Sequence, residues 1–290
     1  MNEKKKKQLI KKCKRTQRLM RFYAWSKRNK SAGLRRFINT KSGKVWIYEY
    51  GFDNPETTPL FIDLHGGGFV LGCAELDEKK CVQFWKTAGI RVVNIDYPKA
   101  PEYPFPAAFE AIYEIIKHYV DNSVQYKIDT ARIGIGGHSA GGNLSAAICI
   151  KANETKDFVL KLQVLNFPPM DMVTDPFKKN SPKGAVSPDE ITMYNVCYFD
   201  NDMEIAKSPY LSPVYATKDQ LKGLPQALLI VAGKDSLYEE GIRYGNMLKD
   251  AGVDVEFHDF KDSVHGFTYY KKPDAQKGID LIANYIKKHL

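Results

Sequence analysis

Six short apolar runs alternate along this chain with stretches of helical spacing, and this alternation constrains the fold more than any other feature. Each run is short and rich in branched or aromatic residues, as expected for a buried strand. The six runs are LFIDLH (60–65), IRVVNID (90–96), RIGIGG (132–137), KLQVLNF (161–167), QALLIVAG (226–233) and VDVEFHDF (253–260). The helical stretches cover residues 75–88, 106–121, 140–152, 237–251 and 274–289. This order predicts an α/β fold in which a mostly parallel central sheet is covered by helices on both faces.

Three further segments stand outside this alternation. KVWIYEY (44–50) alternates apolar and polar residues, which predicts an antiparallel strand at the edge of the sheet. Residues 1–36 have the pattern of one or two amphipathic helices, and residues 169–221 form a long connection rich in Pro, Tyr, Met and Asp. Ligands of α/β sheets bind beyond the carboxyl ends of the strands, where a long connection can cover them. The sequence therefore predicts a core of residues 37–168 and 222–290 under a helical cap of residues 1–36 and 169–221.

The composition favours a packed protein without a membrane span. Hydrophobic residues make up 43% of the 290 residues, which excludes the disordered and fibrous classes. No segment reaches the roughly 18 consecutive apolar residues of a membrane span, and no apolar region of the secretory type follows the basic N-terminal residues. The cysteines are Cys13, Cys73, Cys81, Cys149 and Cys197. Because they have no C-x-x-C spacing, we expect reduced thiols, no metal site and a cytoplasmic location.

The net charge of +9 is concentrated at the N-terminus. Residues 1–36 hold 15 Lys or Arg residues and a single acid, Glu3, so the rest of the chain is mildly acidic. A nucleic-acid partner is not expected, because no basic face with stacking aromatics and no nucleic-acid-binding motif is present. LIKKCKRTQRLMRFYAW (9–25) mixes apolar and basic residues and suits either an anionic membrane surface or a cap helix with a solvated basic face. The second interpretation is the favoured one, and homo-oligomerisation stays open.

One serine lies in a sharp Gly-rich turn. The stretch RIGIGGHSAGGNLSA (132–146) passes from a predicted strand into a predicted helix and contains G-x-S-x-G at residues 137–141. In this context the motif is typical of a nucleophile elbow, in which a strained turn exposes the serine hydroxyl at a helix N-terminus. The partial positive charge of that terminus would stabilise a developing oxyanion. The alternative is an ordinary Gly-rich connection, and the pentapeptide alone does not decide between the two.

A second Gly-rich loop follows an earlier predicted strand. In DLHGGGFVLG (63–72) the consecutive glycines free backbone N–H groups to point at one small target, as in an oxyanion hole. A phosphate-binding loop is the alternative. It is disfavoured because no G-K-[ST] follows and because Phe69, Val70 and Leu71 are apolar.

A serine nucleophile needs a base and an acid that orients the base. Among the six histidines, His265 follows the last predicted strand, where the chain order Ser, then acid, then His places the base. Asp235 follows the preceding strand and is the favoured acid. We expect His65 to brace the Gly loop and expect His138, whose side chain diverges from that of Ser139, not to reach the hydroxyl. The remaining candidates, with structural or solvated roles expected, are His118, Glu239, Glu240, His258, Asp259, Asp262 and His289.

Five segments together resemble the hormone-sensitive-lipase-like family of α/β-hydrolases, which are carboxylesterases. They are HGGGFVLG (65–72), DYPKAPEYPFPAA (96–108), GGHSAGGNLS (136–145), AGKDSLYEEG (232–241) and VHGF (264–267), in the order of the family. The resemblance implies a catalytic triad of Ser139, Asp235 and His265. It also implies an oxyanion hole built from the N–H groups of Gly66, Gly67 and Ala140, in which Gly68 can replace one of the first two, and a cap made of N-terminal helices and a later insertion.

The chain departs from the family pattern at two places. His138 stands where the family usually has Asp, and Pro98 and Lys99 replace the usual Arg-Leu pair. The first change puts the polarity beside the nucleophile in question, and the second the packing around Glu102.

The expected function is that of a serine carboxylesterase acting on small-molecule esters with short- to medium-chain acyl groups through an acyl-enzyme, without metal or organic cofactor. The alternatives are a non-catalytic small-molecule-binding protein on the same fold and an amidase or peptidase with the same triad. Candidate pocket residues, for which plain core packing is an equal alternative, are Phe69, Phe167, Tyr194, Phe199, Tyr210 and Phe267.

Overall fold

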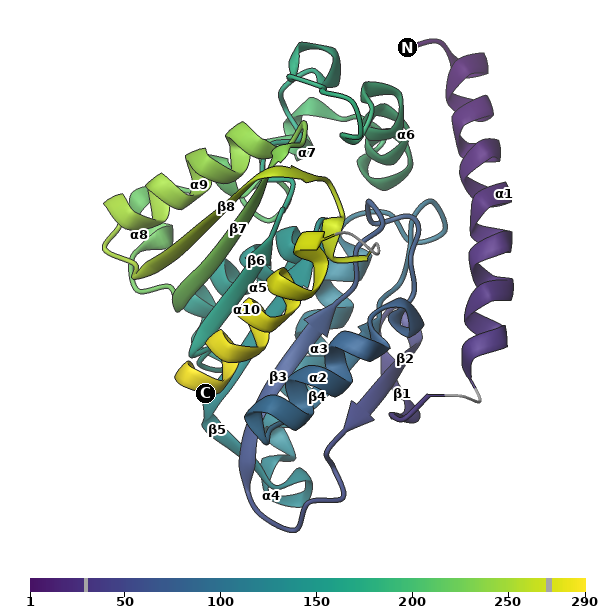
Figure 1. Cartoon of the computed structure of the whole chain (residues 1–290). Coiled ribbons are helices and arrows are strands. Elements are labelled where there is room, and N and C mark those ends of the chain that lie inside the picture. The colour runs from purple at the N-terminus through teal and green to yellow at the C-terminus, as the bar shows by residue number, and fades with distance from the viewer. Residues whose placement is uncertain (29–30, 270–272) are drawn as a thin grey trace.

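The computed structural model describes residues 1–28, 31–269 and 273–290 and forms one sheet of eight strands (Figure 1). The strands are β1 (Leu34–Thr40), β2 (Gly43–Tyr50), β3 (Thr58–Leu64), β4 (Arg91–Asp96), β5 (Ile128–His138), β6 (Leu162–Asn166), β7 (Gln226–Lys234) and β8 (Val255–Val264). Their order is β1-β2-β4-β3-β5-β6-β7-β8, and every pair from β4 to β8 is parallel. The predicted α/β fold with a mostly parallel sheet is thereby confirmed.

Helices connect and cover the strands. The α-helices are α1 (Glu3–Arg28), α2 (Glu78–Ala88), α3 (Ala107–Asp121), α4 (Ser123–Tyr126), α5 (Ala140–Thr155), α6 (Pro188–Phe199), α7 (Met203–Ala206), α8 (Lys218–Leu221), α9 (Tyr238–Asp250) and α10 (Pro273–His289). Short 3₁₀ helices are η1 (Ala74–Leu76), η2 (Pro176–Lys178), η3 (Pro213–Tyr215) and η4 (Phe267–Tyr269). Within the described residues, no helix combines the length and the apolar character that crossing a membrane requires.

The edge of the sheet differs from the prediction. Residues 44–50 do form an antiparallel strand, β2, but β1 pairs with its outer side from Leu34↔Glu49 to Thr40↔Gly43. The edge strand is therefore β1, and the assignment of 44–50 to the edge was wrong. The sequence gives little sign of β1 because none of its residues is fully buried and its two arginines continue the basic N-terminal pattern. β1 also begins inside the 1–36 range predicted as cap.

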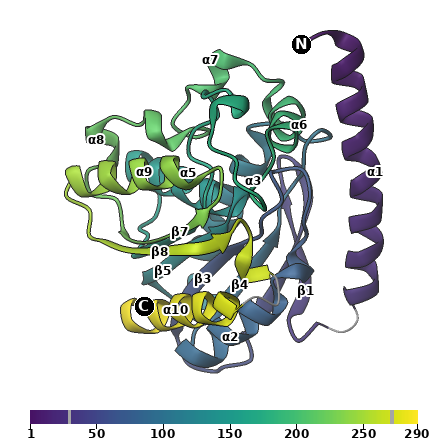
Figure 2. The same cartoon turned by 45° about the horizontal axis from the view of Figure 1, so that its top comes forward.

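Two hydrophobic layers fix the helices on opposite faces of the sheet. Phe61 packs in a cluster with Phe84 of α2 and Ile286 of α10, whereas its neighbour Ile62 packs in a cluster with Leu144 of α5. Successive side chains of a strand point to opposite faces, so each apolar run serves both layers. Figure 2 shows α2 and α10 together on one side of the strands, with α3, α5 and α9 on the other.

The two segments predicted as cap lie side by side. Helix α1 stands beside the body and packs against α6, which belongs to the 169–221 connection, and against η1 (Figures 1 and 2). Lys6 of α1 pairs with Asp200, which follows α6, at 2.6 Å. Residues 29–30 of the predicted cap and 270–272 of the predicted core lie outside the described residues.

Candidate active site

Ser139 occupies the sharp turn between β5 and α5. Its backbone has φ 52° and ψ −120°, a strained conformation for a residue with a side chain, as the motif predicted. The flanking glycines are required because a Cβ at Gly137 or Gly141 would overlap the carbonyl oxygen of Leu64 on the neighbouring strand. Both the strain and the glycines therefore serve to hold this one side chain at the carboxyl edge of the sheet.

Ser139, His265 and Asp235 come together across 126 residues of sequence. His265 Nε2 lies 3.0 Å from Ser139 Oγ, and His265 Nδ1 lies 2.6 Å from Asp235 Oδ2. Asp235 directly follows β7 and His265 directly follows β8, so two adjacent parallel strands deliver the two side chains to the same edge. The ionised carboxylate can only accept, so Nδ1 carries the proton and Nε2 is free to accept the proton of the hydroxyl.

The Gly loop after β3 faces Ser139, but its first glycine differs from the prediction. The N–H of Gly66, expected to bind an oxyanion, donates to Tyr269 Oη at 3.0 Å. Among the described residues, the N–H groups of Gly67 and Gly68 have no hydrogen-bond partner. Their φ values of 128° and 60° are conformations that favour glycine, which explains the repeated residue. The geometry therefore leaves Gly67 and Gly68, rather than Gly66, as the available donors of this loop.

His65 braces the Gly loop, as expected. Its ring is fully buried, donates from Nδ1 to the Gly66 carbonyl at 2.7 Å and stacks on Tyr97 with the ring centroids 4.1 Å apart. On its other side, Nε2 lies 3.5 Å from Asp96, which also binds Lys99 at 2.5 Å. Burial opposes ionisation of Asp96, but Lys99 and His65 outweigh it and hold the pKa of that carboxyl well below its usual range. Lys99, one of the departures from the family pattern, thus takes part in the support of the loop.

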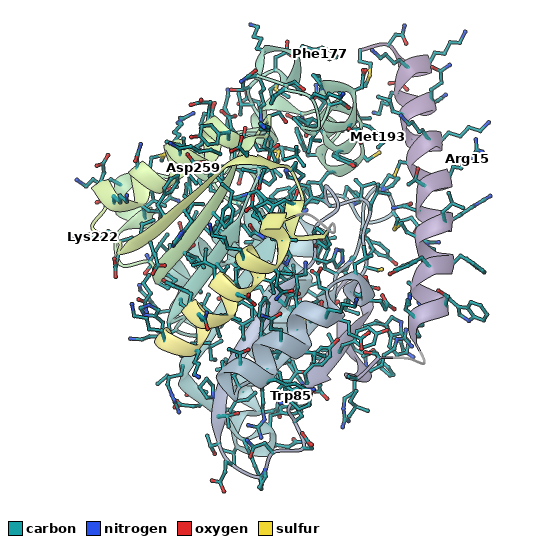
Figure 3. The ribbon with its side chains drawn as sticks, in the orientation of Figure 1. Arg15, Trp85, Phe177, Met193, Lys222 and Asp259 are labelled. Carbon is teal, nitrogen blue, oxygen red and sulfur yellow. The ribbon has the colours of Figure 1, made fainter. Side chains whose placement is uncertain are left out.

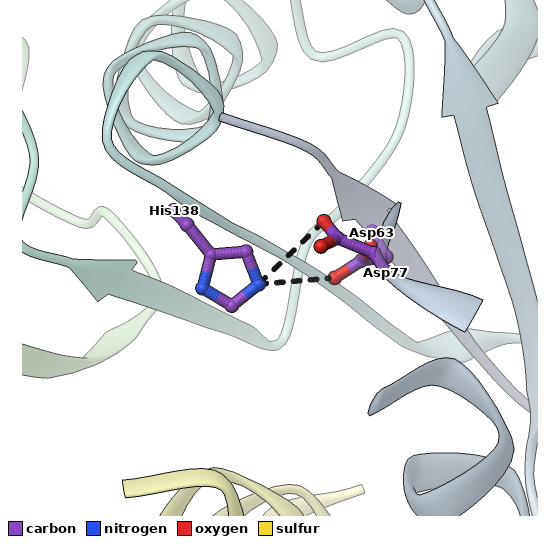
Figure 4. A group of neighbouring side chains, drawn as sticks. All are labelled: Asp63, Asp77 and His138. Atoms are coloured by element: carbon purple, nitrogen blue, oxygen red, sulfur yellow. Dashed lines mark ion pairs between the residues drawn. The ribbon is translucent and has the colours of Figure 1, made fainter. Parts of the chain in front are cut away.

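His138 turns away from Ser139 and enters a buried polar cluster (Figure 4). Asn166 donates to its Nδ1 at 2.8 Å, so the proton of the neutral ring lies on Nε2. That nitrogen faces Asp77 at 3.7 Å and Asp63 at 4.0 Å. As expected, His138 does not serve Ser139, and it contacts the ends of other elements instead.

The donor atoms of Asp63, Asp77 and His138 lie within 4.8 Å of one another, close enough to consider a metal ion. However, the ammonium of Lys80 already binds Asp77 at 2.5 Å and is itself buried. Burial raises the pKa of Asp63 well above its usual value, and burial lowers the pKa of His138 to about 3. Burial also opposes ionisation of Asp77, but Lys80 overcomes it and holds that pKa low. The Lys80 ammonium therefore already supplies a positive charge beside Asp77 in this cluster.

Tyr269 is a residue that the sequence analysis missed. Its hydroxyl accepts from Gly66 N–H, donates to Asp77 at 3.3 Å, and its ring lies under the Lys80 ammonium at 3.6 Å. The residue comes four positions after His265, so it ties the histidine loop to the Gly loop. No signal in the sequence distinguishes it from a core tyrosine, because all of its partners are distant along the chain.

A cavity of about 1060 Å³ opens above the serine. Ser139 and His265 lie in its wall, which also includes Met20 and Tyr23 of α1 and Ile191 of α6. Three of the six candidate pocket residues line it: Phe69, Phe167 and Tyr194. The other three do not line the cavity and pack in the core, which was the alternative given for these residues. Phe199 and Phe267 are buried, and Tyr210 stacks on Phe109.

Comparisons with known proteins identify relatives that share this fold. A family described as alpha/beta hydrolase fold matches residues 61–269. Esterase LipI of Mycobacterium tuberculosis is 33% identical over 73% of this chain, and carboxylic ester hydrolase LipN of the same organism is 32% identical over 78%. The matched parts span 66% and 61% of those two relatives.

Among solved structures, an esterase of Pyrobaculum calidifontis has a TM-score of 0.85 and 30% identity, covering 95% of this chain and 92% of its own. Carboxyl esterase 2 of Tuber melanosporum has a TM-score of 0.83 and 26% identity, covering 90% and 88%. The family match covers more than half of the chain and includes both Gly-rich motifs. The chain therefore belongs to the α/β-hydrolases, in the hormone-sensitive-lipase-like family that its motifs predict.

Proposed function

We propose that this protein is a serine carboxylesterase that hydrolyses small-molecule esters with short- to medium-chain acyl groups. The observation that carries the proposal is the hydrogen-bonded chain Ser139–His265–Asp235, which opens into a cavity whose wall is mostly apolar. Relatives named as esterases support the same reaction class. The substrate itself is a proposal drawn from the cavity and from these names.

The reaction follows from the placement of the three side chains. Ser139 Oγ attacks the ester carbonyl carbon while His265 Nε2 takes the hydroxyl proton, and Asp235 stabilises the imidazolium that forms. His265 then protonates the leaving alcohol, and water, activated by the same histidine, releases the acid from the acyl-enzyme. No step requires a metal or an organic cofactor.

The oxyanion hole is assigned to the N–H groups of Gly67, Gly68 and Ala140. Ala140 is the first residue of α5, so its N–H adds the positive end of the helix to the site. Gly66 is left out of the hole because its N–H is already bound to Tyr269. Each donor of such a hole is typically worth a factor of about 10²–10³ in turnover.

The size of the acyl group is set by the segments over the cavity. Helices α1 and α6 contribute Met20, Tyr23, Ile191 and Tyr194 to the wall, which is the role proposed for residues 1–36 and 169–221 as a cap. Apolar side chains above a polar catalytic edge suit an uncharged acyl chain. The cytoplasmic location remains a prediction, and homo-oligomerisation stays open.

The test compares purified wild-type protein with Ser139→Ala on p-nitrophenyl esters of graded acyl length. We expect the variant to lose activity by a factor on the order of 10³ or more, because it lacks the nucleophile. Ser123→Ala, which changes a serine on the short helix α4, is the matched control and should keep full activity. Full activity in Ser139→Ala would overturn the proposal.

A second arm of the same assay separates the alternative functions. Matched p-nitroanilides report amide hydrolysis, and a faster rate on anilides than on esters would favour the amidase reading. If the wild-type protein binds the esters but turns none over, the non-catalytic binding protein is the better description.

A further inference from the structure

Helix α1 has one face that is fully occupied by the body of the protein. Cys13, Gln17 and Ala24 on this face are buried. Gln17 Nε2 donates to the carbonyls of Val70 and Ala100 at 2.9 and 2.7 Å, which ties the helix to the loops around the Gly-rich motif. The register of α1 on the body is therefore fixed, and so is the set of side chains that it turns outward.

The opposite face exposes three large apolar side chains. Leu19, Phe22 and Trp25 are 67%, 69% and 65% exposed, and the last two rings lie 5.9 Å apart. Their spacing of three residues places them on one side of the helix. Single exposed apolar residues are common, but a contiguous group of this size marks an interaction surface.

Basic residues continue the same stripe toward the N-terminus. They are Lys4, Lys7, Lys11, Arg15 and Arg18, all exposed and spaced by three or four residues. Figure 3 shows Arg15 projecting away from the body. Within the part of the chain that the structure describes, none of the five has a carboxylate within 4.0 Å, whereas Lys6, Arg21 and Arg28 pair with acids of the body. The helix as a whole holds 12 Lys or Arg residues and one acid, Glu3.

We propose that this outer face of α1 binds the surface of anionic phospholipid membranes. The helix would lie parallel to the membrane, with Phe22 and Trp25 at the headgroup level and Arg15 and Arg18 on the lipid phosphates. The positive charge of this face favours an anionic lipid surface over a second copy of the chain, because two such faces would repel each other. The rest of the chain carries a net negative charge, so an anionic surface attracts this side of the molecule and repels the others.

The experiment uses the full chain and vesicles of phosphatidylcholine alone or mixed in equal parts with phosphatidylserine. Co-sedimentation should capture the protein only with the anionic vesicles. The tryptophan emission, to which Trp25, Trp46 and Trp85 all contribute, should shift to the blue as Trp25 enters the lipid. Arg15→Gln/Arg18→Gln should weaken binding on the order of tenfold through lost charge. Leu19→Ser/Phe22→Ser/Trp25→Ser should weaken it on the order of a hundredfold through lost apolar contact.

Two control variants make the same kinds of substitution at exposed positions outside α1. Lys222→Gln/Lys249→Gln removes two exposed charges, and Lys222 lies across the molecule from α1 (Figure 3). Val124→Ser/Val159→Ser removes two apolar side chains that are 93% and 68% exposed. Both controls should bind anionic vesicles like the wild type. Equal binding to neutral vesicles, or wild-type binding by both α1 variants, would overturn the proposal, as would a vesicle-independent dimer that the α1 variants disrupt.

Discussion

The protein loses folding stability when the pH is lowered from about 7 to about 5. In the variant His138→Gln this loss should be smaller by about 2 kcal/mol. The side chain is 2% exposed, and burial, with a smaller contribution from Lys80, lowers its pKa to about 3. In the unfolded chain a histidine has a pKa of about 6.5. The prediction therefore concerns one group whose proton affinity differs strongly between the folded and unfolded states.

The sign follows from which state binds the proton. Above about pH 6.5 His138 is neutral in both states and contributes no pH dependence. Below that value the unfolded state takes up a proton that the folded state excludes until about pH 3. Folding stability therefore decreases as the pH is lowered from about 6.5 to about 3. Each pH unit below about 6.5 lowers the free energy of unfolding by about 1.36 kcal/mol, so the loss due to His138 reaches about 2 kcal/mol at about pH 5.

The two neighbouring carboxyl groups, Asp63 and Asp77, change the pH dependence of folding stability in different ways. The raised pKa of Asp63 lets the folded state bind a proton more readily than the unfolded state, which stabilises the fold as the pH falls. The lowered pKa of Asp77 makes stability fall only in more acidic solution, below the ordinary pKa of about 4 for an Asp. Both groups remain in the variant, and because His138 itself helps to lower the pKa of Asp77, the difference between wild type and His138→Gln reports the histidine together with its coupling to that acid.

The measurement is a set of urea unfolding curves for both proteins at the two pH values. Ile135→Val is the matched control, since it lies buried on the same strand and should cost about 1 kcal/mol at either pH. It should therefore show the wild-type pH dependence. If His138→Gln loses as much stability between the two pH values as the wild type does, His138 is not held neutral by its surroundings and the reasoning fails.

Two further predictions concern the site. Asp235→Asn should lower kcat for a p-nitrophenyl ester on the order of 10⁴-fold, because an amide no longer fixes Nδ1–H of His265; a loss below tenfold in steady-state kinetics would remove Asp235 from its role. Tyr269→Phe leaves the Gly66 N–H without its partner, so kcat should fall on the order of tenfold with KM little changed, while urea unfolding reports a loss of about 1–3 kcal/mol. Tyr215→Phe, a partly exposed tyrosine, serves as its control, and equal kinetics in the two Tyr variants would contradict a positioning role for Tyr269.

The sequence is a good guide wherever a strand is buried on both faces. Every residue of β3 and β6 is buried, so their runs are mostly apolar and stand out from the polar connections. β1 has no fully buried residue and carries no such run, and it was missed for that reason. The short helices α7 and α8 were also beyond the reach of periodicity, because local caps at Asp202 and Thr217 rather than an apolar stripe define them.

For the site, chain order is more informative than local pattern. Asp235 and His265 could be placed because each follows a recognisable strand, and parallel strands end at one edge. The partner of Gly66 could not be placed, because Tyr269 lies 203 residues away and joins it only in the folded protein. The same limit applies to His138, whose surroundings depend on side chains from several other elements, among them β3, β6 and α2.

The buried cluster also answers the question raised by His138 standing where the family usually has Asp. An aspartate at this position would be a third carboxyl group beside Asp63 and Asp77, with the single ammonium of Lys80 to balance them. A neutral imidazole instead accepts from Asn166 and turns its N–H toward the two acids. Because Asp77 also binds Tyr269, which holds the Gly66 N–H, the same cluster fixes the loop that faces Ser139. A histidine at this position is thus compatible with the two acids around it, and its neutral ring maintains the polar cluster beside Ser139.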